Sequence, residues 1–258
     1  MSGTDRVILC MKWGTLYGPE YVNVLYSACR RAMRQPFRFV CLTDDPAGLA
    51  EGVESFPIPD IGLQPKHWRG GGWPKFAVFK ADLYGLKGRA LFIDLDMVIL
   101  RDLDALFDLP DPLITLGSGK NWRPGREEAA DEVMTSVFAF TLGENQYLID
   151  GLMTDLDALV AKHGYEQAAL GALARSMAFF PPRWVISFKR HLRRPVILDL
   201  MLEPKMPPET AKIIAFHGEP RPLDLVRPGW WGELPHVGRG NVSWMVRYWR
   251  DNGGSVAS

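Results

Sequence analysis

One segment constrains this chain more than any other, because an apolar run, Ala90 to Ile93, ends in two carboxylates at Asp94 and Asp96. A short apolar run of this kind predicts a buried strand. Carboxylates two residues apart leave such a strand on the same side once the backbone turns, so they can offer oxygen ligands to a hard divalent cation. The alternative is that one Asp turns or caps the strand end while the other is solvated. The motif alone does not decide between the two.

The segments before the acidic pair predict a parallel sheet. Apolar runs indicate strands at Arg6 to Met11, Phe37 to Leu42, Val53 to Ile58 and Ala90 to Asp94. Apolar residues recur with the helical period from Tyr21 to Met33, and a second helix is expected from Lys75 to Leu86, after a Gly- and Pro-rich loop. An order of strand, helix and strand favours parallel pairing, and ligands of such sheets bind beyond the carboxyl ends of the strands.

The later part of the chain is less regular. We expect a short helix at Asp102 to Phe107, a long helical pattern at Asn145 to His163 that resumes up to Ser176, and strands at Leu113 to Leu116, Ser136 to Thr141 and Lys212 to Phe216. A polar loop is expected at Gly117 to Asp131, and Asn252 to Ser258 is expected to be a disordered tail. The many prolines of the second half should keep interrupting its elements.

Composition narrows the classes of protein that remain. The chain has 258 residues, enough for a single α/β domain, here expected to span residues 1–251. Thirty basic and thirty acidic residues cancel, which argues against nucleic acid or an anionic membrane as the main partner. Three cysteines without Cys-x-x-Cys spacing predict buried thiols in a reducing compartment. With no apolar run near the roughly 20 residues that span a bilayer, a cytoplasmic protein without a transmembrane segment is expected.

Several motifs occur in a fixed order along the chain: a first strand and its loop with Thr15 and Tyr17, then Lys75 to Tyr84, Leu91 to Asp96, Glu166-Gln167 and Phe216 to Gly218. This order resembles that of glycosyltransferases with the GT-A fold. It most resembles the retaining transferases of glycosyltransferase family eight and their bacterial relatives. The resemblance implies a Rossmann-like α/β fold with a mixed, mainly parallel sheet flanked by helices.

The resemblance also implies ligands. The donor would be a nucleotide sugar, usually a UDP-sugar, and the acceptor a saccharide or another hydroxyl compound. Asp94, Asp96 and His217 would ligate a divalent metal, for which Mn²⁺ is favoured over Mg²⁺ because imidazole prefers the softer ion. The metal would bridge the donor diphosphate, and Asp94 would thereby contact the donor. A hydrogen-bonded histidine at a strand end is the alternative for His217.

The resemblance implies further contacts to the donor, at positions of this chain that match donor-binding positions of the family. Gly218 and Arg221 lie where the family binds phosphate, although the chain lacks the family's longer spacing between its His and its Lys. Tyr17 or Trp13 could stack on the base while Thr15 bonds its edge. Lys75 matches a basic residue that contacts the donor. Core packing of the aromatic residues and solvation of the lysine are the alternatives.

Catalytic roles are implied for Glu166 and Gln167, which resemble an acid-amide pair beside the donor sugar. Both could bond sugar hydroxyls, and Gln167 would face the reacting carbon. Glu166 could instead simply favour the positive end of a helix dipole. No separate candidate for a catalytic base is evident, which favours transfer with retention of configuration.

Two other enzyme classes and a non-catalytic binding protein are alternatives to a glycosyltransferase. Haloacid-dehalogenase phosphatases also use Asp-x-Asp, but on their first strand and with a later acidic pair that this chain lacks. A nucleotidyltransferase would need a Gly-rich phosphate loop after the first strand, and none is present there. A non-catalytic protein that binds nucleotide sugars is harder to exclude.

Overall fold

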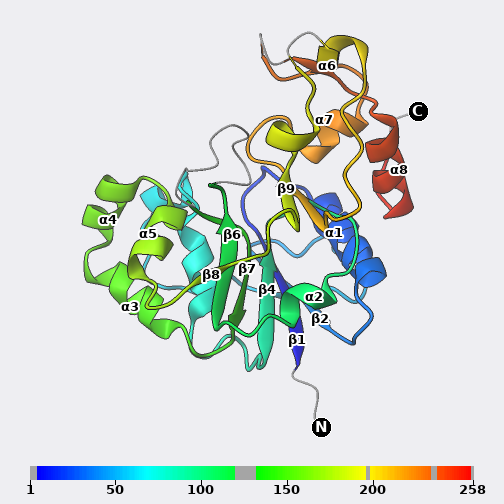
Figure 1. Cartoon of the computed structure of the whole chain (residues 1–258). Coiled ribbons are helices and arrows are strands. Elements are labelled where there is room, and N and C mark those ends of the chain that lie inside the picture. Colours follow the sequence, from blue (N-terminus) through cyan, green and yellow to red (C-terminus); the bar gives the residue numbers. More distant parts are fainter. Residues whose placement is uncertain (1–4, 120–131, 196–197, 234–236, 257–258) are drawn as a thin grey trace.

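The structure is a computed structural model that describes residues 5–119, 132–195, 198–233 and 237–256. Within these residues a seven-stranded sheet forms the centre of the molecule, in the order β3-β2-β1-β4-β7-β6-β8 (Figure 1). Its strands are β1 (Arg6–Lys12), β2 (Arg38–Thr43), β3 (Glu54–Phe56), β4 (Arg89–Ile93), β6 (Leu113–Gly117), β7 (Val133–Thr141) and β8 (Ala178–Phe179). The first four run parallel, whereas β7 pairs antiparallel with β4 and β6. The mixed, mainly parallel α/β sheet expected from the sequence is confirmed.

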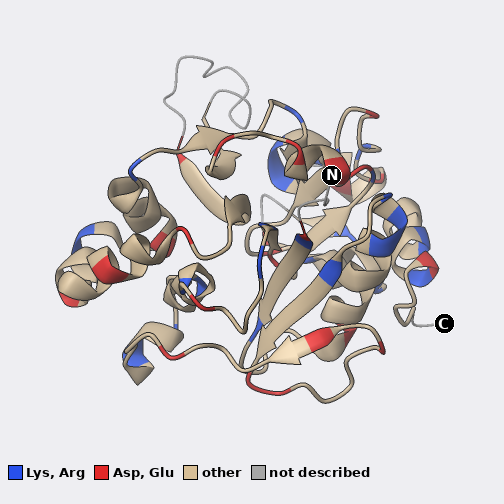
Figure 2. Cartoon of the chain, turned by 90° about the horizontal axis from the view of Figure 1, so that it is seen from below, with Lys and Arg blue, Asp and Glu red and all other residues tan. Residues whose placement is uncertain are grey.

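Both faces of this sheet are buried. Along β1, Ile8 and Cys10 face one apolar core, and Val7, Leu9 and Met11 face the other. This follows from the two-residue period of a strand, and it explains why the strands read as continuous apolar runs. Figure 2 shows Lys and Arg interspersed with Asp and Glu along helices and loops, while most of the strand surface carries neither.

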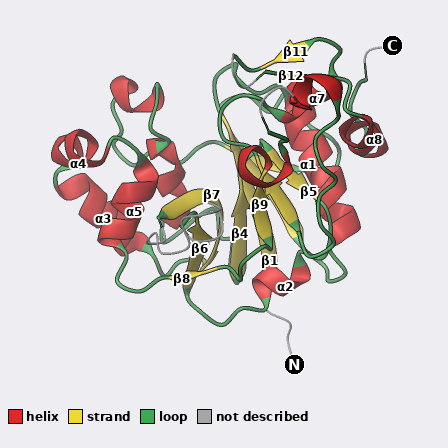
Figure 3. Ribbon diagram, turned by 45° about the horizontal axis from the view of Figure 1, so that its top comes forward, coloured by secondary structure: helices red, strands yellow, loops and turns green. Residues whose placement is uncertain are grey.

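Helices cover the two faces (Figure 3). One core contains α1 (Pro19–Ala32) and the C-terminal residues, and the other contains the 3₁₀ segment η2 (Trp73–Phe79), α3 (Gln146–Thr154), α4 (Leu156–His163) and α5 (Glu166–Leu173). The short elements η1 (Pro65–Trp68) and α2 (Asp104–Phe107) lie in connections of the first half. Buried thiols are confirmed, since Cys10, Cys29 and Cys41 are free and buried.

The C-terminal lobe, residues 184–256, contributes two of the three strands of a small sheet in the order β5-β10-β9. Its strands β9 (Val185–Ser187) and β10 (Ile213–Ala215) come from the lobe, whereas β5 (Met97–Ile99) directly follows the acidic pair. The other elements of the lobe are η3 (Phe188–Leu192), α6 (Leu198–Met201), α7 (Pro222–Val226), β11 (Trp230–Trp231), β12 (Gly238–Arg239) and α8 (Ser243–Asp251). The described helices include none that is both long and apolar enough to cross a membrane.

The prediction of a helix from Lys75 to Leu86 is wrong, because the segment forms a 3₁₀ helix that ends earlier. The chain forms 3₁₀ turns over Trp73–Phe79 that end at Lys80, where ψ is 134°, and further on Tyr84 and Gly85 adopt positive φ angles of 55° and 68°. The Asp82 carboxylate accepts a hydrogen bond from the Gly85 amide at 2.9 Å and fixes this turn.

The long helix expected at Asn145 to His163 is two helices. Asp155 separates α3 from α4 with φ −155° and ψ 72°, and its carboxylate accepts from the Ala158 amide at 3.1 Å. Asp is a favoured N-cap residue, and this cap starts the second helix.

The segment expected to be a disordered tail makes contacts with the rest of the chain over its described part. Asn252 is buried, its side-chain amide donates to the Tyr248 carbonyl oxygen at 2.8 Å, and the Ser255 amide donates to Glu20 of α1. The last two residues of that segment, and residues 120–131 of the expected polar loop, lie outside the described residues.

Candidate functional site

The acidic pair lies on a direct link between the large sheet and the sheet β5-β10-β9. β4 ends at Ile93 and β5 begins at Met97, so Asp94, Leu95 and Asp96 alone join them. The Asp94 amide donates to the Ser136 carbonyl oxygen at 2.9 Å, and the Met97 amide donates to the Asp94 carbonyl oxygen at 3.3 Å. Leu95 is buried in the core while both carboxylates are half-buried. Packing of Leu95 therefore directs Asp94 and Asp96 out of the core.

Asp94 belongs to a network of buried charges. The Lys75 ammonium donates to Asp94 Oδ2 at 2.7 Å and lies 3.3 Å from Glu166 Oε1. Thr135 of β7 also donates to Glu166 Oε1, at 2.5 Å. Burial acts to lower the pKa of Lys75, but the charges of Asp94 and Glu166 raise it above its ordinary value. Burial raises the pKa of Asp94, against the opposing effect of Lys75. One cation thus joins two carboxylates from distant segments.

Asp96 has a different partner. The Tyr17 hydroxyl donates to Asp96 Oδ2 at 2.9 Å, and the Arg221 guanidinium lies 5.6 Å from the centre of the Tyr17 ring. Burial raises the pKa of Tyr17, and so does the charge of Asp96. Burial also raises the pKa of Asp96, although the Tyr17 bond lowers it. Three candidates from distant parts of the sequence, Tyr17, Asp96 and Arg221, therefore meet.

A cavity of about 550 Å³ lies in front of the acidic pair. Its lining includes seven of the predicted site residues: Trp13, Thr15, Tyr17, Lys75, Asp94, Asp96 and Glu166. The size falls within the range of small-molecule sites, and the position lies beyond the carboxyl ends of β1 and β4. On one wall the Trp13 indole donates to the Trp68 carbonyl oxygen at 3.4 Å, and the two rings meet edge to face.

Glu166 also lines this cavity, at the start of α5, but Gln167 does not. The Glu166 amide donates to the Gly71 carbonyl oxygen at 2.8 Å. Gly72 has a φ of 71°, and a Cβ atom there would lie 2.4 to 2.7 Å from the Glu166 carboxyl group. Gly72 is thus required both by its backbone conformation and by the close approach of Glu166.

His217 has a hydrogen-bond partner outside the cavity lining. It follows β10, its Nε2 is 2.7 Å from the Ser187 hydroxyl, and it is not among the residues that line the cavity. Burial lowers the pKa of His217 to about 4, and the nearby charges of Lys189, Arg190 and His191 add to this effect. Gly218, next in the chain, is exposed with a φ of 67°.

A preassembled metal group is not found in the part of the chain that the structure describes. No three His, Cys, Asp or Glu side chains there are placed to hold an ion together. The structure thus brings Asp94 and Asp96 together but does not bring His217 into a common group with them. The metal remains a prediction.

Two further residues of the site are not among the residues assigned a site role from the sequence. Thr135 fixes the Glu166 carboxylate, and Trp68 forms a wall of the cavity. Thr135 precedes the strand predicted from Ser136, so a strand extended by one residue would have included it at the same sheet edge. Nothing in the local sequence of Trp68 distinguishes it from a core tryptophan.

The fold is that of the glycosyltransferases. No family model and no curated protein matches the sequence. Solved structures do match it, however, with sequence identities so low that they establish the fold alone. The GT-A-type glycosyltransferase fold expected from the sequence is confirmed.

Three of these structures illustrate the match. The galactosyltransferase LgtC, in complex with donor and acceptor sugar analogues, is 13% identical with a TM-score of 0.58 and covers 96% of this chain and 95% of its own. The bifunctional glycosyltransferase WbbM is 12% identical with a TM-score of 0.61, covering 98% of this chain and 50% of its own. The apo form of the glycosyltransferase GlyE from Streptococcus pneumoniae TIGR4 is 16% identical with a TM-score of 0.55, and covers 98% of this chain and 61% of its own.

Proposed function

We propose that this protein is a glycosyltransferase that moves a sugar from a nucleotide diphosphate donor, with UDP as the expected nucleotide, to a hydroxyl acceptor. The observation that carries the proposal is the pair Asp94 and Asp96 in a cavity of about 550 Å³, at the carboxyl ends of parallel strands. The fold and the aromatic wall beside the pair support it. The galactosyltransferase LgtC, which shares the fold, was solved with donor and acceptor sugar analogues.

A divalent metal fits the acidic pair. Asp94 and Asp96 supply carboxylate oxygens, the ligands that Mg²⁺ and Mn²⁺ accept, and burial disfavours two adjacent negative charges unless a cation accompanies them. These two residues would hold the ion, with His217 proposed as a third ligand from the family resemblance. When bound, the metal would offset negative charge on the departing diphosphate.

The other residues have binding roles in this proposal. Trp13 and Tyr17 offer aromatic faces for the base, and Thr15 and backbone amides can bond its edge. Lys75 and Arg221 supply positive charge toward the diphosphate, with Gly218 beside it. Glu166, held by Thr135 and Lys75, can accept hydrogen bonds from sugar hydroxyls, and Gln167 is proposed to act next to it.

Retention of configuration is the proposed stereochemical outcome. Glu166 is the remaining carboxylate of the cavity lining, and it is already bonded to Thr135 and close to Lys75, so it is poorly placed to serve as a base. The acceptor oxygen would then attack from the side of the leaving group. The bond from the anomeric carbon to the phosphate oxygen breaks, and the leaving phosphate takes the acceptor proton.

Thermal denaturation tests the proposal directly. UDP should raise the melting temperature in the presence of Mn²⁺ and have little effect in excess chelator, because the metal bridges protein and diphosphate. Asp94→Ala should abolish this shift, whereas Asp111→Ala, an exposed residue outside the cavity, should keep it. Equal stabilisation of the wild-type protein with and without metal would contradict the metal-bridged site.

Product analysis separates an enzyme from a binder. With an α-linked UDP-sugar and a saccharide acceptor, proton NMR of the first product should show an α-linked sugar. A β-anomeric signal would contradict retention. Metal-dependent UDP binding without any transfer or donor hydrolysis would instead favour a non-catalytic nucleotide-sugar binder.

A further inference from the structure

Three segments of the chain meet at one edge of the small sheet β5-β10-β9. Ala215 of β10 pairs with Met97 of β5 on one side and with Ser187 of β9 on the other. β5 begins directly after the acidic pair, whereas β9 and β10 lead into Lys189 and His217, each two residues beyond its strand. Adjacent strands lie about 4.8 Å apart, so the ends of β5 and β9 at this edge are separated by roughly 10 Å.

Side-chain contacts show that the alignment of β9 and β10 continues beyond the strands. The rings of Phe188 and Phe216, one residue further on, stack at 4.7 Å between their centres. Two residues later, a Cβ atom at Gly218 would lie 3.7 Å from Lys189 Nζ. The Lys189 ammonium therefore lies directly beside the chain that follows His217.

Lys189 and Arg190 carry positive charges without a carboxylate partner, and we call these two residues the basic pair. In the part of the chain that the structure describes, neither side chain forms a hydrogen bond or an ion pair, and Arg190 is exposed. Burial and the charges of Arg193 and Arg190 lower the pKa of Lys189, against an opposing effect of Glu219. A bound anion would offset this local excess of positive charge.

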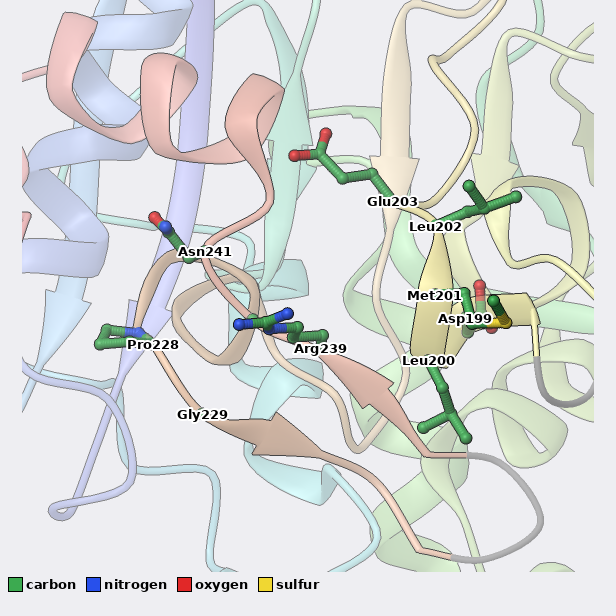
Figure 4. Close-up of a pocket in the computed structure, with 10 residues that line it drawn as sticks. Asp199, Leu200, Met201, Leu202, Glu203, Pro228, Gly229, Arg239 and Asn241 are labelled. Carbon is green, nitrogen blue, oxygen red and sulfur yellow. The ribbon is translucent and has the colours of Figure 1, made fainter.

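Other acids of the lobe are engaged elsewhere. Arg193, the next cation along the chain, donates from Nε to Asp199 at 3.0 Å. Glu203 accepts from the Ser243 hydroxyl at 2.6 Å. Figure 4 shows Asp199 and Glu203 at a separate hollow of about 300 Å³, whose lining includes neither member of the basic pair. These two acids therefore do not neutralise the basic pair.

We propose that the basic pair binds an acidic group of the acceptor, so that the acceptor is an anionic compound, such as a saccharide that carries a phosphate or a carboxylate. This inference rests on the proposed function, because it concerns the second substrate of that reaction. Ammonium and guanidinium groups form strong, charge-assisted hydrogen bonds with phosphate and carboxylate oxygens. A neutral saccharide would leave both cations without a partner.

The position of the basic pair favours the acceptor over the donor. The acidic pair, proposed to hold the donor, lines the cavity of about 550 Å³, whereas the basic pair does not line it. β10 lies between β5 and β9, so the basic pair lies on the far side of β10 from the acidic link. Lys75 and Arg221 already supply positive charge on the donor side. An acceptor in front of the donor would thus bring its acidic group toward the basic pair.

Thermal denaturation and titration calorimetry with two simple sugars test the requirement for charge. With UDP and Mn²⁺ present, glucose 6-phosphate should raise the melting temperature at concentrations at which glucose has no effect. Lys189→Gln should weaken the binding of glucose 6-phosphate about tenfold, the expected loss of one charge-assisted hydrogen bond, whereas Lys189→Arg should keep most of it. Arg190→Gln should weaken it about threefold, because an exposed charge contributes less.

The control variant is Lys162→Gln on α4, which removes an exposed lysine far from the basic pair in sequence and should bind both ligands as the wild type does. The proposal is overturned if glucose 6-phosphate and glucose act alike, if neither Lys189→Gln nor Arg190→Gln weakens binding, or if UDP displaces glucose 6-phosphate. An equal loss of UDP affinity in Lys189→Gln would also overturn it, by assigning the basic pair to the donor. If UDP does not bind while glucose 6-phosphate still depends on Lys189, the acidic-sugar site stands and the donor assignment fails.

Discussion

The large sheet and the C-terminal lobe are built in different ways. In the large sheet, β1, β2 and β4 are buried along almost their whole length, and each pairs in register with a neighbour. In the lobe, β9 and β10 have three residues each, and one member of their sheet, β5, belongs to the first half of the chain. Local sequence thus specifies the large sheet, whereas the lobe depends on contacts supplied by β5 and α1.

We expect the lobe and the large sheet to unfold together. Phe138 of the large sheet and Phe188 of the lobe are both fully buried, and Phe188 stacks on Phe216 at 4.7 Å between ring centres. Because the core on the α1 face continues into the lobe, we expect Phe138→Ala and Phe188→Ala each to cost about 3–5 kcal/mol in one cooperative transition. Calorimetry checks this, with the exposed Phe179→Ala as control. Two separated transitions would show that the lobe folds independently.

We expect the residues needed for sugar transfer to lie at the end of the large sheet, on the segment between β4 and β5. Asp96→Ala should lower turnover at least about a hundredfold, a loss of roughly 2.7 kcal/mol of transition-state stabilisation, with the melting temperature nearly unchanged. Steady-state rates with a UDP-sugar measure the effect, and Asp111→Ala is the control. A variant that melts far below the wild type would make Asp96 a structural residue instead.

Hydrogen bonds join α1 to the end of the chain and hold the lobe against the large sheet. Glu20 Oε1 accepts from the buried Trp249 indole at 2.9 Å and from the Ser255 amide. Glu20→Ala leaves that buried N–H without its acceptor, so we expect about 1–3 kcal/mol of destabilisation. Hydrogen exchange should show faster exchange at Ser255. Glu51→Ala, at an exposed site, should change neither quantity.

The smallest effect is expected at the sheet edge. Arg38 and Glu54 pair across β2 and β3 at 2.6 Å, but both side chains are more than a third exposed. Such pairs contribute about 0.2–1 kcal/mol, so Arg38→Ala should shift denaturant midpoints only slightly. A loss near that of Phe138→Ala would mean that the edge strand, and not the buried cores, holds the large sheet together.

The large sheet was easier to predict from the sequence than the lobe, because the residues that specify its strands are neighbours in sequence. Buried parallel strands such as Ala90 to Ile93 give continuous apolar runs, and Asp94 and Asp96 mark their end. The break at Asp155 was missed because the apolar period continues across it, although Asp is a common N-cap. The lobe's short strands and the contacts of the segment after Asn252 depend on partners far away in sequence, such as Glu20.

The candidate site, too, could be predicted from the sequence only in part. Motif order placed Tyr17, Lys75 and the acidic pair in one region, and the structure brings them together around a single cavity. The order of the motifs could not reveal that Lys75 bridges Asp94 and Glu166, because that contact joins three separate segments. Nor could it reveal that Gln167 lies outside the lining while Glu166 is within it, since this depends on how α5 is rotated about its axis.

The link between β4 and β5 has a mechanical consequence. Three residues span at most roughly 10 Å, so β5, which pairs with β10 of the lobe, is held close to the end of β4 by the very segment that carries both carboxylates. A shift of the small sheet relative to the large one would therefore act on the backbone of Asp94 and Asp96. Relative motion of the two sheets would thus change the angle between the two carboxylates.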